Sequence, residues 1–284
     1  MPARTDMASE SQYIAAGREL DGAVRNDEFV HSAQLDITRI EIITDAAARK
    51  IGRPKGRYMT LKAADRSFEA EAARFNERAR LLSREIAALL PDDMSGGALF
   101  AGLGNRQITP DSVGPLAADR ILATRHIDNR VLKDLGELAK ISVISPGVLA
   151  QTGIESALLL RLIANSIKPS VMIVCDAFAC SDMGNLGTTV QLCDTGISPG
   201  SGVGNCRAEI SGRTMGVPCI AIGIPTVADI AAVTCTQVGS PDGMIITPSY
   251  IDSVVRQGAA LISLAVNMAL HPGLTVEEIN ALVG

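Results

Sequence analysis

Apolar runs in the second half of the chain alternate with segments of helical periodicity. Three runs are apolar throughout, as strands covered on both faces are, and two others alternate apolar and polar residues with the period of a half-buried strand. The predicted strands are Ala98–Gly104, Ser170–Phe178 and Val217–Pro225, and, with alternation, Gln34–Thr44 and Thr188–Asp194. The turn-rich segment Lys50–Leu61 predicts a hairpin or loop.

The segments between these runs predict helices. Residues 63–90 are alanine-rich and charged, with few helix breakers. Three further helices carry start signals: Thr109 with Pro110, a Thr152/Glu155 capping box, and Thr247 with Pro248. In the second of these, Ile154, Leu158 and Leu162 share one face, and a last short helix opens with a Thr275/Glu278 capping box. Strands alternating with helices predict an α/β fold with helices on both faces of the sheet.

Composition limits the kinds of partner. The formal net charge of −5 disfavours binding to nucleic acid by bulk electrostatics, and 3% aromatic residues without tryptophan disfavour stacking on bases. The apolar run Gly258–Leu270 is too short to span a bilayer and is expected to form a buried helix. The N-terminal residues lack the apolar core of a signal peptide. We expect a soluble intracellular protein that does not bind nucleic acid or a membrane.

The cysteines and histidines predict no metal site or cofactor. All six cysteines lie in the second half of the chain, and none forms a C-x-x-C pair. Because several lie in apolar runs, we expect buried, reduced thiols. His31, His126 and His271 are far apart in the sequence and match no metal-ligand or triad spacing.

Two aspartates follow predicted strands at the positions where α/β proteins form their sites. Asp111 comes after the strand Ala98–Gly104, in the first turn of the next helix, and Asp176 comes after Val171–Cys175. If these strands are parallel neighbours, both carboxylates emerge at one sheet edge. One can then act as a general base and the other as a general acid. We expect a helix start to favour ionised Asp111 and desolvation to keep a proton on Asp176. The alternative is that each aspartate only caps its element.

The stretch CDTGISPGSGVGN, residues 193–205, contains an Asp-Thr-Gly tripeptide and a glycine run. Pepsin-like proteases carry two such tripeptides in a β-rich fold, but here one copy lies in an α/β chain, so Asp194 is expected to support the site rather than form a pepsin-type pair. The glycines allow close backbone approach. The expected lining of a substrate cleft is Asp194, Gly200, Gly202, Gly204 and Asn105.

Four segments together resemble the germination protease of spore-forming bacteria. They are GLGNRQITPDSVGP (102–115), SPGVLAQTGIES (145–156), VCDAFAC (174–180) and DTGISPGSGVGN with IGIPTVAD (194–229). The resemblance implies an atypical aspartic endopeptidase, related in fold to hydrogenase-maturation proteases. It also implies a tetramer in the spore core, small acid-soluble spore proteins as substrates, and Asp111 and Asp176 as the essential aspartates.

The N-terminus fits the same resemblance. RTDMASE (4–10) is similar to the family's autoprocessing site, and DMASE to its substrate motif of acidic residue, bulky apolar residue, Ala, Ser and acidic residue. Cleavage between Asp6 and Met7 would divide the chain into a propeptide, residues 1–6, and a single protease domain, residues 7–284. A flexible terminus favours such a cut. The propeptide is shorter than the family leads us to expect, as is the segment between Ile230 and Met244.

Two other functions remain open at this point. A metal-dependent maturation-type endopeptidase of the same fold would use Asp111 and Asp176 as metal ligands, although no histidine is an evident third ligand. A non-catalytic nucleotide-binding module would use Gly200, Gly202 and Gly204, but this G-x-G-x-G run does not complete G-x-G-x-x-G, and no G-K-[ST] follows.

Overall fold

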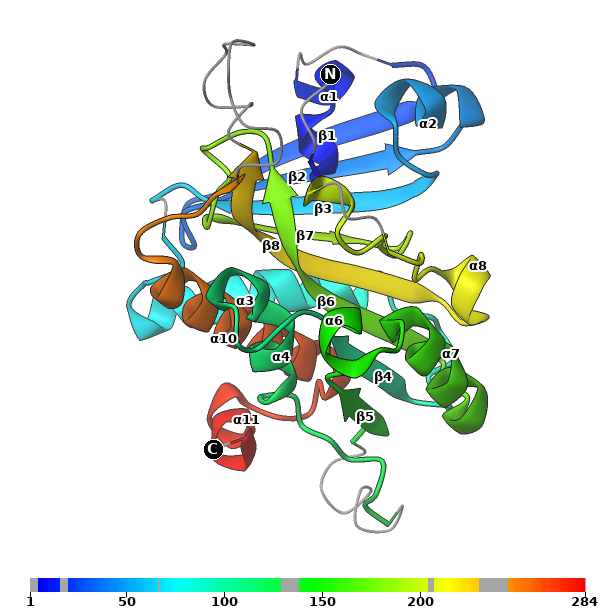
Figure 1. The fold of residues 1–284 in the computed structure, drawn as a ribbon. Helices are drawn as coiled ribbons and strands as arrows, with labels where there is room; N and C mark the ends of the chain where they lie inside the picture. The colour runs from blue at the N-terminus through cyan, green and yellow to red at the C-terminus, as the bar shows by residue number, and fades with distance from the viewer. Residues whose placement is uncertain are drawn as a thin grey trace.

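One large mixed sheet organises the molecule. The computed structural model describes residues 5–15, 20–65, 67–128, 138–203, 207–229 and 245–283, and within them the sheet has nine strands in the order β1-β2-β3-β7-β8-β6-β4-β5, with β9 beside β8 (Figure 1). The antiparallel part contains β1 (Ala23–Val30), β2 (Leu35–Ile42), β3 (Gly56–Ala63), β7 (Thr189–Cys193), β8 (Cys219–Asp229) and β9 (Ile245–Ile246). The part parallel to β8 contains β6 (Val171–Cys180), β4 (Ala98–Gly102) and β5 (Ile141–Ile144).

Helices cover both faces of the sheet, as predicted (Figure 1). Successive residues of β6 pack into two different apolar clusters, Ile173 with one and Met172 with the other. The first cluster includes residues of α3 (Ala72–Ala87), α4 (Val113–Ala118), α10 (Ile251–Leu270) and α11 (Val276–Val283). On the opposite face lie α7 (Ser156–Ile167), α8 (Gly212–Met215), α1 (Gln12–Ala15) and α2 (Asp45–Ile51). Because β6 is buried on both faces, its sequence is a continuous apolar run.

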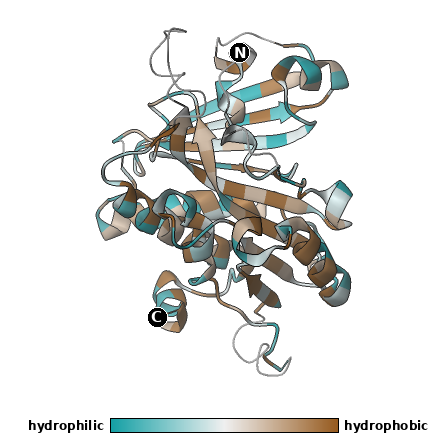
Figure 2. Ribbon diagram, in the orientation of Figure 1, coloured by the Kyte–Doolittle hydropathy of each residue, from teal (hydrophilic) through white to brown (hydrophobic). Residues whose placement is uncertain are grey.

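Helix α10 has the length and apolar composition of a membrane span, but 72% of its most apolar window is buried inside the protein. Its residues Ile262 and Val266 pack with Leu82 and Ile86 of α3 in the core between helices and sheet. The predicted buried helix is therefore confirmed, and it begins seven residues earlier than the run Gly258–Leu270. Figure 2 shows that α10 and the strands near it are more apolar than the hairpin formed by β1 and β2.

Several local predictions are corrected by the structure. Residues 50–61 contain the end of α2 and most of β3 rather than a simple hairpin or loop, and β1 was not predicted. Thr109 and Pro110 lie in a 3-10 turn, η2 (Thr109–Asp111), that precedes the short helix α4. Thr247 does not cap α10, since its hydroxyl donates to the carbonyl of Thr226. The Thr275/Glu278 capping box is confirmed by reciprocal hydrogen bonds.

The predicted Thr152/Glu155 capping box is wrong. A short helix, α6 (Leu149–Thr152), ends at Gly153, whose φ of 70° stops it, and α7 begins after Glu155. Helix α7 buries Ala157, Leu160 and Ala164, while the predicted apolar face is turned outward, with Ile154, Leu158 and Leu162 between 41% and 58% exposed.

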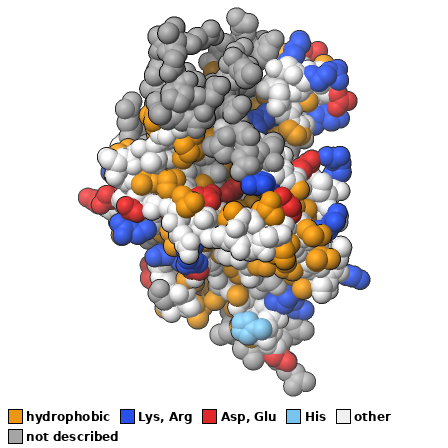
Figure 3. All heavy atoms as spheres, viewed as in Figure 1, with side chains coloured by type: hydrophobic (Ala, Val, Ile, Leu, Met, Phe, Trp, Pro, Cys, Tyr) orange, Lys and Arg blue, Asp and Glu red, His pale blue; other side chains and the backbone are white. Residues whose placement is uncertain are grey.

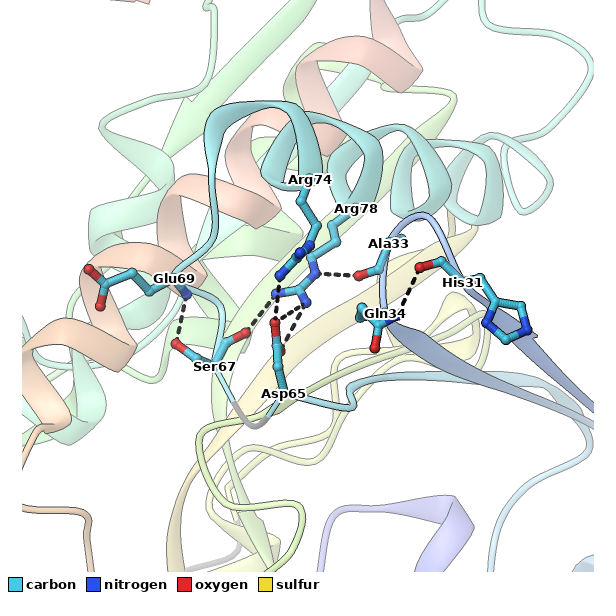
Figure 4. A network of polar contacts seen from close by, with 8 residues as sticks. All are labelled: His31, Ala33, Gln34, Asp65, Ser67, Glu69, Arg74 and Arg78. Carbon is cyan, nitrogen blue, oxygen red and sulfur yellow. Dashed lines mark hydrogen bonds and ion pairs between the residues drawn. The ribbon is translucent and has the colours of Figure 1, made fainter.

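A buried arginine joins helix α3 to the β2–β3 sheet (Figure 4). The Arg78 guanidinium is fully buried. It donates to the carbonyl oxygens of Ala33 and Ser67, at 2.8 Å and 2.6 Å, and to both carboxylate oxygens of Asp65. These bonds satisfy the charge inside the protein, which makes the burial of Arg78 tolerable. The network fixes the helix against the loop that follows β3.

Candidate active site

Asp111 and Asp176 lie at one edge of the parallel half of the sheet and line the same cavity. Strands β4 and β6 are parallel neighbours, with Gly102 opposite Cys175. Asp176 therefore stands on β6 one residue past the end of β4, and Asp111 lies in the 3-10 turn η2 that follows β4. The cavity has a volume of about 440 Å³. Figure 3 shows acidic side chains next to apolar ones across the middle of the visible face of the molecule. The two carboxylates that the sequence singles out are brought together.

The turn after β4 positions Asp111. Gly104 has a φ of 111°, and a Cβ there would collide with the carbonyl oxygen of Asp111, so only glycine allows this close approach. The amide of Asn105 donates to Asp111 Oδ2 at 2.8 Å. Burial raises the pKa of Asp111, and the Asn105 amide opposes this only in part. The expectation that a helix start favours ionised Asp111 is wrong. Asp111 lies in a single 3-10 turn, and its desolvation outweighs the hydrogen bond from the Asn105 amide.

Asp176 is the more deeply buried member of the pair, with 6% of its surface exposed. Burial, and then the charge of Asp111, raise its pKa well above the usual value, while a hydrogen bond from the Ala177 amide at 2.9 Å acts in the opposite direction. Asp6 raises this pKa further. The sequence-based expectation that Asp176 holds a proton agrees with these directions. Because the charge of Asp111 acts on Asp176, we expect the two carboxyl groups to titrate as a coupled pair.

The N-terminal segment occupies the same site. Asp6 lines the cavity with Asp111 and Asp176. Its amide donates to the Ala179 carbonyl at 2.9 Å, and its carboxylate accepts hydrogen bonds from the Ala179 amide and the Ser201 hydroxyl. The prediction of a flexible start is therefore wrong for residues 5–11, because long-range hydrogen bonds and burial hold them.

Met7 follows directly and is 1% exposed. It packs in an apolar cluster with Phe178, Cys180, Leu186 and Ala228. Both predicted processing residues, Asp6 and Met7, are thus fixed next to the carboxylate pair.

The other predicted cleft residues have different outcomes. Asn105 and Gly200 line the cavity. Gly202 contacts the bound N-terminal segment, since a Cβ there would collide with Asp6 Oδ2. Gly204 lies outside the described residues.

Asp194 is not part of the cavity lining that the structure describes. The register of β7 with β3 puts Cys193 opposite Tyr58, so Asp194 lies beside Arg57 and accepts hydrogen bonds from its amide and guanidinium. The assignment of Asp194 to the cleft is corrected accordingly. Its carboxylate holds the end of β7 against the start of β3.

Two groups of site residues were missed by sequence reasoning. Gln191, buried on β7, donates to the Asp6 carbonyl at 2.8 Å and accepts from the Ala8 amide at 2.6 Å. A glutamine in the middle of an apolar strand was a usable signal for this role. Ser181 and Asn185, which contact Glu10, lie in a loop and carried no such signal.

The described cysteines and acidic residues form no further reactive or metal-binding cluster. Cys175, Cys180, Cys193 and Cys219 are free and buried, and burial raises the pKa of each thiol, that of Cys180 and Cys219 to about 12. Among the residues that the structure describes, no three His, Cys, Asp or Glu side chains are grouped to hold a metal ion.

Comparison with known proteins identifies the family. The family model described as germination protease matches residues 3–240. The chain belongs to the germination protease family. It is 34% identical to the germination protease of Caldanaerobacter subterraneus subsp. tengcongensis, covering 99% of this chain and 98% of the relative. It is 31% identical to the germination protease of Clostridium tetani, which aligns with 99% of each chain. It is 36% identical to that of Priestia megaterium, over 81% of this chain and 65% of the relative.

Membership of the germination protease family makes the chain a protease and favours this function over a nucleotide-binding module. Among solved structures, a [NiFe] hydrogenase maturation protease, HycI from Thermococcus kodakarensis, is similar to 64% of this chain and 98% of its own, at 16% identity and a TM-score of 0.37.

Proposed function

We propose that this chain is an endopeptidase that degrades small acid-soluble spore proteins during germination, using Asp111 and Asp176 as an acid–base pair. The observation that supports this most strongly is the shared cavity of the two carboxylates, in which the charge of Asp111 raises the pKa of Asp176. Unequal environments of two carboxyl groups are the usual basis of acid and base roles. The family name of the relatives supports a role in germinating spores.

The proposed roles follow from the two environments. Each carboxylate accepts one amide hydrogen bond, but Asp111 is only half-buried whereas Asp176 is buried, which favours the charged form of Asp111 relative to Asp176. It would take a proton from the water that attacks the scissile carbonyl carbon. Asp176, which holds its proton because of burial and the neighbouring charge, would give that proton to the leaving amide nitrogen. After product release, the proton on Asp111 returns to solvent and Asp176 is reprotonated.

Processing between Asp6 and Met7 is part of the proposal. A segment that adds backbone hydrogen bonds to a strand edge is a common way for a peptide to bind a protein. Asp6 makes one such backbone bond, from its amide to the carbonyl of Ala179, three residues beyond Asp176 on β6, and its carboxylate accepts the Ala179 amide at the lining of the cavity of the pair. The arrangement supports a substrate-like position for the residues that flank the proposed cut.

The proposed surroundings are the spore core and a homotetramer, both on the strength of the family resemblance. Sedimentation velocity of the purified chain at several concentrations tests the tetramer. A single species near four times the chain mass of 29.7 kDa is expected, and a monomer at all concentrations contradicts it.

Digestion of a purified small acid-soluble spore protein tests the proposed activity. We expect a few discrete fragments whose new N-termini follow an acidic residue, as mapped by mass spectrometry. The same digestion with a chelator tests the metal-dependent alternative, and unchanged rates are expected. No cleavage of the spore protein, or loss of activity with the chelator, would contradict the proposal.

A further inference from the structure

The carbonyl group of Asp6, which belongs to the proposed Asp6–Met7 cleavage bond, is bound by the side chain of Gln191. Gln191 Nε2 donates to the Asp6 carbonyl oxygen at 2.8 Å, and Gln191 Oε1 accepts from the amide of Ala8 at 2.6 Å. These partners fix the orientation of the side-chain amide, because a carbonyl oxygen only accepts and a backbone amide only donates. Among the described residues, no other hydrogen-bond donor contacts the Asp6 carbonyl oxygen.

Gln191 lies on the same face of the sheet as Asp176. Both residues are paired with Gly223 of β8, Gln191 from β7 and Asp176 from β6. Directly paired residues of neighbouring strands project their side chains to the same face, and the next residues along, Leu192 and Cys175, pack in one apolar cluster on the other face. Because Gly223 has no side chain, β8 places none between the buried carboxyl of Asp176 and the amide of Gln191.

The side chain of Gln191 serves the N-terminal segment rather than the body of the protein. It is 3% exposed and stands between the buried residues Val190 and Leu192. Within the part of the chain that the structure describes, both of its hydrogen bonds go to residues 6–8. A buried amide is costly unless its polar atoms are bonded, so a glutamine at this position is suited to a bound peptide backbone.

We propose that Gln191 is a further catalytic residue of the proposed peptidase, and that its side-chain NH2 group stabilises the negative charge that develops on the carbonyl oxygen of the cleaved bond. The inference rests on the proposed cleavage between Asp6 and Met7. When the water oxygen bonds to the Asp6 carbonyl carbon, a water proton passes to Asp111, and the electron pair of the C=O bond moves onto the oxygen that Gln191 Nε2 contacts. When the carbonyl forms again, the C–N bond breaks and the Met7 nitrogen takes the proton of Asp176.

The two contacts of Gln191 should affect different kinetic constants. A hydrogen bond to a charged oxygen is about twice as strong as one to a neutral carbonyl, so the Nε2 contact strengthens in the transition state and raises kcat. Burial already holds Gln191 in position before the reaction, so the donor needs no reorganisation. The contact of Oε1 with the Ala8 amide does not change during the reaction, and it therefore contributes only to substrate binding.

Steady-state cleavage of a labelled peptide with the sequence of residues 3–12, ARTDMASESQ, separates the two effects. The variant Gln191→Met keeps a side chain of similar length that suits an apolar strand, but it has no donor. We expect kcat to fall about 10²–10³-fold, the usual cost of removing one such donor, and KM to rise up to about tenfold. The N-terminal segment of the full chain competes with the peptide, which changes KM but not kcat at saturating peptide.

Two further variants accompany this measurement, and melting temperatures check that each is folded. Gln191→Asn keeps the amide on a side chain that is one carbon shorter, so it should lose the contact with the carbonyl and show a similar loss in kcat. Gln257→Met is the matched control. Gln257 lies on α10 and donates to the Ser253 hydroxyl at 3.0 Å, and this variant should keep the kinetic constants of the wild type.

A second peptide isolates the binding contact. It carries an ester oxygen in place of the N–H group that corresponds to the Ala8 amide, which removes only the contact with Gln191 Oε1. With the wild-type chain, this change should raise KM several-fold and leave kcat unchanged. With Gln191→Met, the two peptides should behave alike.

The outcomes separate this inference from the proposed function. A wild-type kcat in both Gln191→Met and Gln191→Asn, with only KM raised, would overturn the catalytic role of Gln191 and leave the proposed function in place. A wild-type chain that leaves the Asp–Met bond of the peptide uncut would contradict the proposed function and this inference with it.

Discussion

Asp6 and Ala179 are joined by two hydrogen bonds, each 2.9 Å long: the Asp6 amide donates to the Ala179 carbonyl, and the Ala179 amide donates to Asp6 Oδ2. Ala179 lies on β6 three residues after Asp176. The beginning of the chain is therefore bound to the strand that carries the buried carboxylate.

This pairing predicts processing of the N-terminus by the chain's own active site. Incubation of the purified protein should remove residues 1–6, and intact-mass spectrometry measures the loss directly. Ser201→Ala should slow the reaction about five- to tenfold, because the Ser201 hydroxyl donates to Asp6 Oδ1 at 2.7 Å. Asp176→Asn should keep its full mass. An active wild-type enzyme with an intact N-terminus would show that the processing proposal is wrong.

Gly202 should be required for binding of the segment in the cleft. A Cβ at this position would collide with Asp6 Oδ2 and lie 2.7 Å from the Ala179 Cβ. Gly202→Ala is expected to lower the rate of N-terminal processing at least tenfold with little change in melting temperature. Gly212→Ala is the matched control, because a Cβ there meets nothing closer than 3.5 Å. Equal processing by both variants would rule out a steric role of Gly202.

The buried carboxyl of Asp176 should make stability depend on pH. Burial and the Asp111 charge raise its pKa in the folded chain, so between the unfolded and the folded pKa the folded state holds a proton that the unfolded state has lost. The stabilisation is fully present below the unfolded pKa and is lost as pH rises through the folded pKa. The Asp176→Asn variant should show a flatter dependence of melting temperature on pH between these two pKa values. At pH values above the folded pKa it should melt several degrees higher than the wild type.

Differential scanning fluorimetry across the pH range measures this effect. The exposed carboxylate Asp119, paired with Arg106, provides the control variant Asp119→Asn, which should retain the wild-type slope. A wild-type slope in Asp176→Asn would contradict the buried, protonated state.

The Arg78 network should contribute strongly to folding. Arg78→Ala leaves Asp65 without its buried partner and two carbonyl groups without a donor, so we expect a loss of about 3–5 kcal/mol in the free energy of unfolding. Arg74, which is 40% exposed and makes one contact of 3.4 Å with Asp65, is the matched control, with an expected loss below about 1 kcal/mol. Urea denaturation gives both values. Similar losses for the two variants would refute the special role of Arg78.

The buried strands were predictable because their pattern is local. Continuous burial on both faces makes β4 and most of β6 apolar, and Asp176 interrupts the run of β6 one residue past the end of β4, where the edge of the sheet begins. β1 was missed because it is exposed along most of its length and depends on pairing with β2. The face of α7 was misjudged because apolar residues occupy more than one side of this helix, so periodicity alone does not select the buried one.

The site was predictable only where the end of β4 defines the sheet edge. Asp111 follows the end of β4, and Asp176 lies on β6 one residue past that end. The contacts of Asp6 and Glu10 join residues more than 170 positions apart, and no local pattern encodes them. Asp194 was misplaced because the β3–β7 register, which sets its neighbour Arg57, comes from the tertiary fold.

The central claim is that Asp111 and Asp176 carry out the cleavage together. The most direct measurement is kcat/KM for a small acid-soluble spore protein with Asp111→Asn, Asp176→Asn and the control Asp119→Asn, each checked for folding by circular dichroism. Removing a proton-transfer group typically costs 10²–10⁴-fold, so we predict a loss of at least about a hundredfold in each of the first two variants and less than about twofold in the control. Wild-type activity in either Asp111→Asn or Asp176→Asn would contradict the account.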